Sequence, residues 1–320
     1  MLAVVDIPLQ VRFRGITRRQ AMVWQGPAGW AEWSPFLDYH GAEIVPWLAA
    51  ADEAANVGWP APVRDRVPVN CTIPVLEPDA AAERVAASGC STAKIKVADP
   101  RCTAADDAAR VAAVREALGP SGRIRIDANA AWDLDTAVDR ISTLARYDLE
   151  YAEQPVASTE DLARLRVRLA RAGVEVPIAA DESIRRSGDP QRVKELDAAD
   201  VAILKVQPLG GVRRCLELAE LLAMPVVVSS ALETSVGLAA GVALAAALPE
   251  LPMACGLNTA NLLTGDVVAE PVRAEGGTIA VRGTAPVVDR QALADFAADD
   301  QVQQWWQDRL AGTRALEGVR

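Results

Sequence analysis

The sequence predicts an α/β protein, a (β/α)7β barrel of the TIM type that carries a smaller α+β capping domain. Between residues 67 and 270, short β-like runs alternate with helical patterns, and one such unit takes roughly 25–30 residues. Charged side chains end five successive runs, and neighbouring members of this series are 24 to 31 positions apart: Lys96, Asp127, Glu153, Asp181 and Lys205. Because the carboxyl ends of parallel strands meet at one mouth of a closed barrel, these side chains should converge there.

The first 66 residues do not follow this rhythm, and we expect them to form the capping domain. Leu2–Val5 and Ala21–Trp24 are strand-like, and Glu43–Ala55 has a helical pattern. The tail, residues 271–320, also departs from the alternation and should pack on the N-terminal segment. Its expected elements are a strand at Thr278–Val281 and helices at Asp289–Asp295 and Val302–Ala311.

Within the barrel, residues 67–270, each unit has its own local signals. The helix after Ser158 is the clearest, since Leu162, Leu165 and Leu169 fall on one face and Gly173 follows the last turn. No helix of normal length follows the eighth strand, which gives seven helices. The other expected elements are strands at Val69–Ile73, Lys94–Val97, Pro225–Ser229 and Pro252–Cys255, and helices at Pro78–Ser88, Thr103–Leu118, Pro190–Leu196, Val212–Ala223 and Ser235–Leu248.

Composition excludes several classes of function. The net charge is −10 and there is no polybasic run, so nucleic acid is not an expected partner. The longest apolar stretch, Val236–Leu248, is too short to span a bilayer, and no leader opens the chain, so we expect a cytoplasmic protein without a membrane partner. His40 is the single histidine, which excludes histidine-based zinc sites and Ser-His-Asp triads.

Three of the converging residues are suited to bind a metal. Asp127, Glu153 and Asp181 offer hard oxygen ligands, which favour Mg²⁺, or alternatively Mn²⁺, over zinc. A single carboxylate at a strand end is more commonly a helix cap, but three in consecutive units indicate a site. A small carboxylate substrate bound to the metal could gain a second negative charge as an enediolate, which the cation would stabilise.

The lysines are candidates for proton transfer. Lys94 and Lys96 point to the same face of one strand, where mutual repulsion and partial desolvation should lower a lysine pKa toward that of a useful base. Lys205 reaches the mouth from the opposite side, either as a second base or as a fixed cation.

Further residues could contact an anionic substrate. Arg125 shares a strand face with Asp127 and could pair with a substrate carboxylate, and Ser229 and Ser230 could hold an anion at a helix N-terminus. Four arginines surround Gly15: Arg12, Arg14, Arg18 and Arg19. They form either a solvated hairpin tip or a mobile flap that meets the substrate.

These residues together resemble the enolase superfamily and, within it, the muconate-lactonizing-enzyme subgroup. The matching motifs run across nearly the whole chain: Lys94-Ile95-Lys96, Asp127-Ala128-Asn129, Glu153-Gln154-Pro155, Asp181-Glu182-Ser183, Leu204-Lys205 with Gly210-Gly211, and Gly29-Trp30-Ala31-Glu32-Trp33-Ser34-Pro35, in which Ala31 replaces a usual glycine. The resemblance implies a Mg²⁺ site, a lysine base and an ene-diolate, as known for that superfamily.

Within the subgroup the chain is most similar to the o-succinylbenzoate synthase family, on Arg125 and on the loops at residues 229–235 and 256–259. This resemblance implies a syn dehydration of 2-succinyl-6-hydroxy-2,4-cyclohexadiene-1-carboxylate in menaquinone biosynthesis. Lys96 would act as base and acid, Lys205 as a cation, and the substrate contacts would be Lys94, Arg125, Asn129, Ser229, Ser230 and Leu257.

Two alternatives stay open. One is an N-acylamino acid racemase or another enzyme of the subgroup; residues 256–261 lack the acidic pair typical of dipeptide epimerases. The other is a non-catalytic barrel that binds a metal or a carboxylate metabolite. Proton exchange at the substrate α-carbon would distinguish the last from an enzyme.

Overall fold

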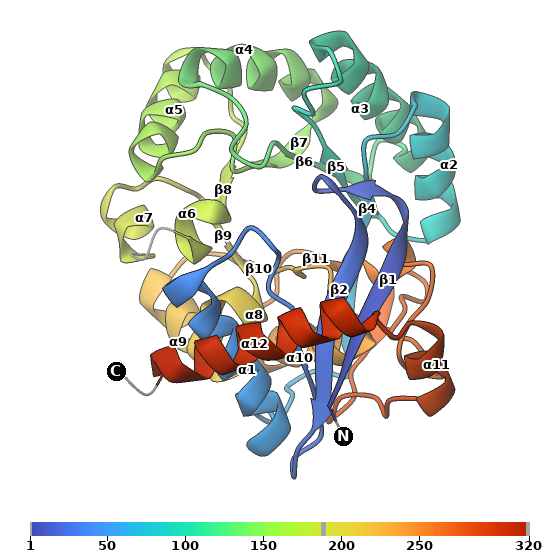
Figure 1. The fold of residues 1–320 in the computed structure, drawn as a ribbon. Coiled ribbons are helices and arrows are strands. Elements are labelled where there is room, and N and C mark those ends of the chain that lie inside the picture. The colour runs from blue at the N-terminus through green and yellow to red at the C-terminus, as the bar shows by residue number, and fades with distance from the viewer. Residues whose placement is uncertain (1, 187–189, 318–320) are drawn as a thin grey trace.

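The computed structural model describes residues 2–186 and 190–317, and its main body is a closed barrel (Figure 1). Eight parallel strands follow one another around the barrel in chain order, and β11 returns to pair with β4. A bridge between Ser229 and Gly256 joins the ends of β10 and β11. The strands are β4 (Arg66–Ile73), β5 (Thr92–Lys96), β6 (Arg123–Asp127), β7 (Leu149–Glu153), β8 (Ile178–Ala180), β9 (Val201–Leu204), β10 (Val226–Val228) and β11 (Cys255–Asn258).

Helices cover the outside of the barrel after each of the first seven strands, and β11 is followed only by the short turn η3 (Ala260–Leu262). The predicted (β/α)7β architecture is therefore confirmed. Helix starts follow local chemistry: Thr103 and Asp106 form a reciprocal capping box, and Ser158 accepts from the Asp161 N–H. The helices are α2 (Pro78–Ser88), α3 (Ala104–Leu118), α4 (Leu134–Leu144) with η2 (Ala145–Tyr147), α5 (Thr159–Arg171), α6 (Glu182–Arg185), α7 (Gln191–Glu195), α8 (Val206–Leu209), α9 (Val212–Leu222) and α10 (Ser235–Ala247).

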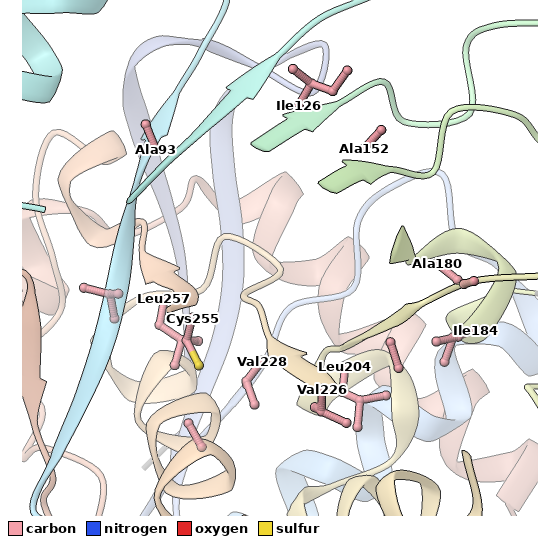
Figure 2. Packing of buried hydrophobic residues seen from close by; sticks show 14 of the residues in the cluster. Ala93, Ile126, Ala152, Ala180, Ile184, Leu204, Val226, Val228, Cys255 and Leu257 are labelled. Carbon is pink, nitrogen blue, oxygen red and sulfur yellow. The ribbon is translucent and has the colours of Figure 1, made fainter. Parts of the chain in front are cut away.

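The alternation of side chains along each strand separates two layers. One set packs outward against the helices in the main core, and Figure 2 shows Ala93, Ile126, Ala152, Val228 and Leu257 among them. The other set points into the barrel, where a small apolar cluster lies below the mouth: Tyr151, Ala179, Val201, Ile203 and Val227. Because side chains alternate with a period of two, Glu153, Asp181, Lys205 and Ser229, each two residues beyond a member of this cluster, point toward the mouth.

The capping domain is a three-stranded antiparallel sheet with helices packed on it. Its aromatic core joins the two ends of the chain, since Trp33 and Trp306 meet edge to face with ring centroids 5.4 Å apart. Figure 1 shows α12 lying across β1, β2 and α1. The elements are β1 (Leu2–Phe13), β2 (Ile16–Gln25), β3 (Trp30–Trp33), η1 (Gly41–Ile44), α1 (Val45–Asn56), α11 (Arg290–Asp295) and α12 (Asp300–Glu317).

Two expected segments differ in the structure. The eighth strand begins at Cys255 rather than Pro252, because Pro252 has no N–H for the ladder whereas Gly256 bridges to Ser229. In the tail, β12 (Thr278–Ala280) pairs with β4 and buries Ile279 in the barrel core, although we expected residues 271–320 to pack on the cap. The first residues of β4 extend below the barrel and leave a free edge for this pairing.

Every helix within residues 2–186 and 190–317 is too short or too polar to cross a membrane.

Candidate active site

A pocket opens at the carboxyl ends of the barrel strands, beneath the cap. Seven of the residues expected at the site line it: Lys94, Lys96, Asp127, Asn129, Lys205, Ser229 and Ser230. Arg14, from the hairpin proposed as a flap, and Thr259, from the loop at residues 256–259, also line it, and further lining residues come from parts of the chain that sequence reasoning did not assign to the site: Thr72 and Arg185 from the barrel, and Phe13, Phe36 and Trp47 from the cap.

Strand register places the three carboxylates at the ends of neighbouring strands. Lys96 pairs with Asp127, and Asp127 pairs with Glu153, so the last residues of β5, β6 and β7 stand side by side. Asp181 follows β8 directly. Asp127, Glu153 and Asp181 are all buried, with at most 1% of their surface exposed.

The lysine ammonium groups contact these carboxylates directly. Lys94 Nζ lies 2.8 Å from both carboxylate oxygens of Glu153 and 3.3 Å from Asp127 Oδ2. Lys96 Nζ lies 2.5 Å from the same Asp127 oxygen, and Lys205 Nζ lies 2.6 Å from Asp181 Oδ2. Lysines from two strands thus meet the acidic cluster from two sides.

Burial and charge act in opposite directions on the carboxyl groups. Burial, together with the charges of Asp127 and Asp181, raises the pKa of Glu153 to about 7. Burial also acts to raise the pKa of Asp127, but Lys96 and Lys94 outweigh it and hold that pKa well below its usual range. The cluster therefore depends on nearby positive charge to stay ionised.

The carboxylates of Asp127, Glu153 and Asp181 are suitable ligands for a hard divalent cation, although their side chains are not arranged around a common point. Among the described residues, no three histidine, cysteine, aspartate or glutamate side chains converge so that they could hold a metal ion. Instead the Lys94 ammonium lies between Asp127 and Glu153, where a shared cation would be held. Three buried carboxylates offer the oxygen ligands that Mg²⁺ prefers. For a metal to bind here, the lysine ammonium groups must give up their contacts with those oxygens.

The pKa argument for the paired lysines needs correction. Burial acts to lower the pKa of Lys94, but Glu153 and Asp127 outweigh burial, and the Lys94 pKa is raised. Repulsion from Lys96 does not decide the outcome, because carboxylate oxygens are within 2.8 Å. Burial, with the charge of Arg185, instead lowers the pKa of Lys205 despite its contact with Asp181.

Arg185 is a member of the site that sequence reasoning missed. It stands one helical turn after Asp181, and this i, i+4 spacing was a signal that could have found it. Its Nε lies 2.8 Å from Asp181 Oδ1, and Nη2 lies 2.5 Å from Glu182 Oε1. Nη1 donates to the hydroxyl of Tyr39 in the cap. The guanidinium therefore links one predicted metal ligand to the capping domain.

Arg125 does not lie where we expected a substrate contact. It is fully buried one layer below the mouth, where Nε donates to Glu150 at 2.6 Å and Nη1 donates to the Ala254 carbonyl at 2.7 Å and to Asn70 at 3.2 Å. Its guanidinium stacks on Tyr151, 4.7 Å from the ring centroid. The predicted contact with a substrate carboxylate does not fit this position. Arg125 shares a strand face with Asp127, but it lies two residues deeper in the barrel.

The two loops expected to contact substrate are placed differently. Ser229 and Ser230 line the pocket, and Ser230 Oγ is 2.7 Å from Thr259 Oγ1. The Leu257 side chain points outward into the helical layer (Figure 2). Contrary to our expectation, it therefore does not line the pocket. Its neighbour Gly256 lines the mouth instead, as the alternation along β11 requires.

The four arginines near Gly15 are divided by the β1–β2 hairpin. Arg14, at the turn, lines the pocket and stacks on Phe36, 4.1 Å from the ring centroid. Arg12 and Arg18 are exposed, and Arg18 pairs with Asp6 at 2.9 Å. Arg19 is buried. The four arginines therefore lie neither all at a solvated hairpin tip nor all on a flap that faces the substrate.

The fold and the mouth together define the class of protein: a capped barrel whose mouth brings lysines and buried carboxylates into contact. Residues 4–55 match the enolase N-terminal domain-like family and residues 78–286 match the enolase C-terminal domain-like family. The chain is 58% identical to o-succinylbenzoate synthase from Thermobifida fusca, over 97% of this chain and 94% of that protein. It is 49% identical to the o-succinylbenzoate synthase of Mycolicibacterium smegmatis, over 98% and 95%.

Muconate lactonizing enzyme from Pseudomonas putida has the same fold, with a TM-score of 0.76 and 21% identity over 93% of this chain and 98% of that one. The chain belongs to the enolase superfamily and, within it, to the o-succinylbenzoate synthase family. Members of this superfamily use Mg²⁺ with a lysine or histidine base.

Proposed function

We propose that this protein is an o-succinylbenzoate synthase that converts 2-succinyl-6-hydroxy-2,4-cyclohexadiene-1-carboxylate to 2-succinylbenzoate and water in menaquinone biosynthesis. The observation that carries the proposal is the sequence identity of 48 to 58% to curated o-succinylbenzoate synthases over nearly the full chain. A mouth at which lysines from two strands meet buried carboxylates supports it. We propose Mg²⁺ as the cofactor, with Mn²⁺ as a substitute, and a cytoplasmic location.

Asp127, Glu153 and Asp181 would hold the metal. When bound, a divalent cation supplies stabilisation for the second negative charge that develops on the substrate carboxylate. Lys96 removes the α-proton as a neutral amine, and the electron pair of the broken C–H bond remains on the substrate as an enediolate. Loss of the hydroxyl group then makes the ring aromatic. Because proton and hydroxyl leave from the same face, Lys96 can return its proton to the departing hydroxide.

Lys205 remains protonated in this scheme. Its ammonium group faces the pocket from β9, where it stabilises the anion and the π-face of the ring by charge. Its contact with Asp181 fixes its position in the absence of substrate.

The substrate carries two carboxylates, and the protein as a whole is negatively charged at −10. A locally basic mouth is therefore required to attract it. Lys94 and Arg14 supply positive charge, Ser229 and Ser230 offer hydroxyl donors, and Asn129 positions Lys96 by accepting from its Nζ at 2.7 Å.

The decisive experiment offers the cyclohexadiene substrate and Mg²⁺ to the purified protein and follows the appearance of the aromatic product by absorbance. EDTA should abolish turnover, and Mg²⁺ or Mn²⁺ should restore it. Full turnover in EDTA would remove the metal from the proposal. Racemisation of N-acylamino acids without dehydration would favour the racemase, and a complete lack of α-proton exchange in deuterated water would favour a non-catalytic barrel.

A further inference from the structure

One wall of the pocket is a loop without regular structure. It connects β10 to α10, and Ser229, Ser230, Ala231 and Leu232 all face the pocket from it. Leu232 has a left-handed backbone with φ of +63°, which is unfavourable for a branched aliphatic residue. Such a conformation persists only where surrounding contacts impose it. Contacts from the capping domain help to impose it here.

Arg19 of β2 makes the central contacts. Its side chain is buried, and Nε donates to the Leu232 carbonyl at 3.0 Å while Nη2 donates to the Ala231 carbonyl at 3.1 Å. Nη2 also donates to Ser34, to its carbonyl and to its hydroxyl at 2.9 Å. The same guanidinium lies over Phe36, 4.4 Å from the ring centroid. One buried cation thus joins the barrel loop to the cap segment that carries Phe36.

Two buried carboxyl groups hold the other side of the loop. Glu233 accepts from the Ala231 N–H at 2.7 Å, and Glu32 of the cap accepts from the N–H and hydroxyl of Thr234 at 3.0 and 2.6 Å. The loop backbone is therefore held at its carbonyls by Arg19 and at its amides by carboxyl groups. The hydrogen bonds from the Arg19 guanidinium are charge-assisted and are among the strongest available to a loop.

We propose that Arg19 is a positioning residue for substrate binding: it preforms the apolar pocket wall made by Ala231, Leu232 and Phe36. Arg19 itself does not line this pocket. The inference rests on the proposed function, because it assumes that this wall contacts the ring of the substrate. A rigid wall contacts the substrate equally before and during reaction, so its loss raises KM rather than lowering kcat.

The test compares Arg19→Met with the control Arg18→Met in the full-length protein with Mg²⁺. Arg18 is the neighbouring residue of the same strand, but it is exposed, and among the described residues its guanidinium contacts Asp6 of β1. For Arg19→Met we expect KM to rise about tenfold, with kcat changed by less than about threefold. Arg19→Lys, which keeps the charge but not the planar fork, should show an intermediate KM. Arg18→Met should match the wild type.

A second readout does not depend on turnover. Hydrogen exchange, measured without substrate, should speed up at the amides of Ala231 and Thr234 in Arg19→Met, by about tenfold or more, and stay unchanged in Arg18→Met. Unchanged exchange at these amides, or a fall in kcat with KM unchanged, overturns the positioning role. If the wild type fails to turn over the cyclohexadiene, the proposed function fails, and the exchange data still decide whether Arg19 holds the loop. If Arg19→Met does not fold, Arg19→Lys carries the same two measurements.

Discussion

Three lysines at the mouth share one residue type but differ in surroundings. Lys94 is held by both oxygens of Glu153, which suits a structural cation. Lys96 contacts a single oxygen of Asp127 and the amide of Asn129, and it lies 5.3 Å from the Phe13 ring centroid at the hairpin tip. Lys205 reaches the pocket from β9. Lys205, like Lys96, contacts one carboxylate oxygen, so our proposal of Lys96 as the proton carrier rests on the syn geometry of the dehydration.

Replacing the two pocket lysines should separate their roles. Lys96→Ala should lose at least about 10²–10⁴-fold in dehydration, the usual size of a general-base contribution, together with exchange of the α-proton. Lys205→Arg keeps a positive charge that cannot act as a base near neutrality, and it should still exchange that proton. The measurement is deuterium incorporation from labelled water, beside product absorbance.

The opposite pattern would identify a two-base racemase. It would appear as exchange lost on one face of a chiral N-acylamino acid in Lys96→Ala and on the other face in Lys205→Arg.

Arg125 shows that alternation along a strand can predict the direction of a side chain without predicting its contacts. The alternation correctly directs the side chain into the barrel, but sequence carries no measure of depth, and the partners of Arg125 come from β7 and from residues near β4 and β11. By contrast, the strand-end carboxylates were predictable, because a charged residue that closes an apolar run must lie at the rim.

Arg125→Met should therefore act on stability rather than on substrate binding. Removing the buried guanidinium leaves Asn70 and the partly exposed Glu150 without their donor, and the free energy of unfolding should fall by about 3 kcal/mol. Arg123→Met, on the same strand but exposed, should change it by less than about 0.5 kcal/mol. Urea unfolding gives these values, and a tenfold higher KM in a stable Arg125→Met enzyme would restore Arg125 to the substrate site.

At the scale of single elements, most helices with a predicted range were placed within about two residues, since capping side chains and glycine stops are local signals, but α12 continues six residues beyond its predicted end and α4 had no predicted range. Strand bounds were less accurate: β11 begins three residues later than expected and β1 is much longer. Whether a strand continues depends on a partner far away in sequence, such as β2 for β1 or the Ser229 bridge for β11. The Arg185 contact was missed for the same reason, because its partner Tyr39 lies in the cap.

The start of α9 shows such a long-range contact at a motif residue. Glu53 of α1 accepts from the Val212 N–H at 2.5 Å and from the Arg213 N–H at 3.2 Å, which caps the helix from outside the barrel. Gly211 permits this approach: it has φ of +120°, and an added Cβ would lie 2.3 Å from Glu53 Oε2. The two consecutive glycines noted in the sequence thus lie where the cap docks on the barrel.

Gly211→Ala should lower the free energy of unfolding by about 2 kcal/mol, through backbone strain and displacement of the Glu53 cap. Gly312→Ala is the matched control, because Gly312 is exposed in α12 with open space around its Cα. Alanine there should raise stability by up to about 1 kcal/mol. Equal stabilities of the two variants in chemical unfolding would contradict this role for Gly211.

For the whole molecule, the contact between cap and barrel contains ionisable groups that are buried. Burial, with the neighbouring Glu233 charge, raises the pKa of Glu32 to about 7 from an ordinary value of 4.5. Between these two pH values the folded protein holds a proton that the unfolded chain releases. The contribution of Glu32 to stability is therefore largest below pH 4.5 and falls as the pH rises through 7.

Glu32→Gln should remove this part of the pH dependence. The wild type should lose up to about 3 kcal/mol of unfolding free energy relative to the variant as the pH rises from 4.5 to 8. The comparison requires chemical unfolding of both proteins across that range, with Glu43→Gln as an exposed control on the cap. Parallel stability curves for wild type and Glu32→Gln would show that Glu32 does not titrate there.

Glu32 and Glu53 also bear on how this protein could have diverged. Both lie in the N-terminal segment, yet Glu53 caps α9 and Glu32 accepts from the amides of Thr234 and Gly237 at the start of α10. The two parts of the chain are thus not interchangeable modules. A chimera that joins this barrel to the cap of a distant relative would keep both helix ends only if the foreign cap delivered carboxylates to the same two points. Recombination within the superfamily is therefore constrained by two glutamates that lie outside the barrel they complete.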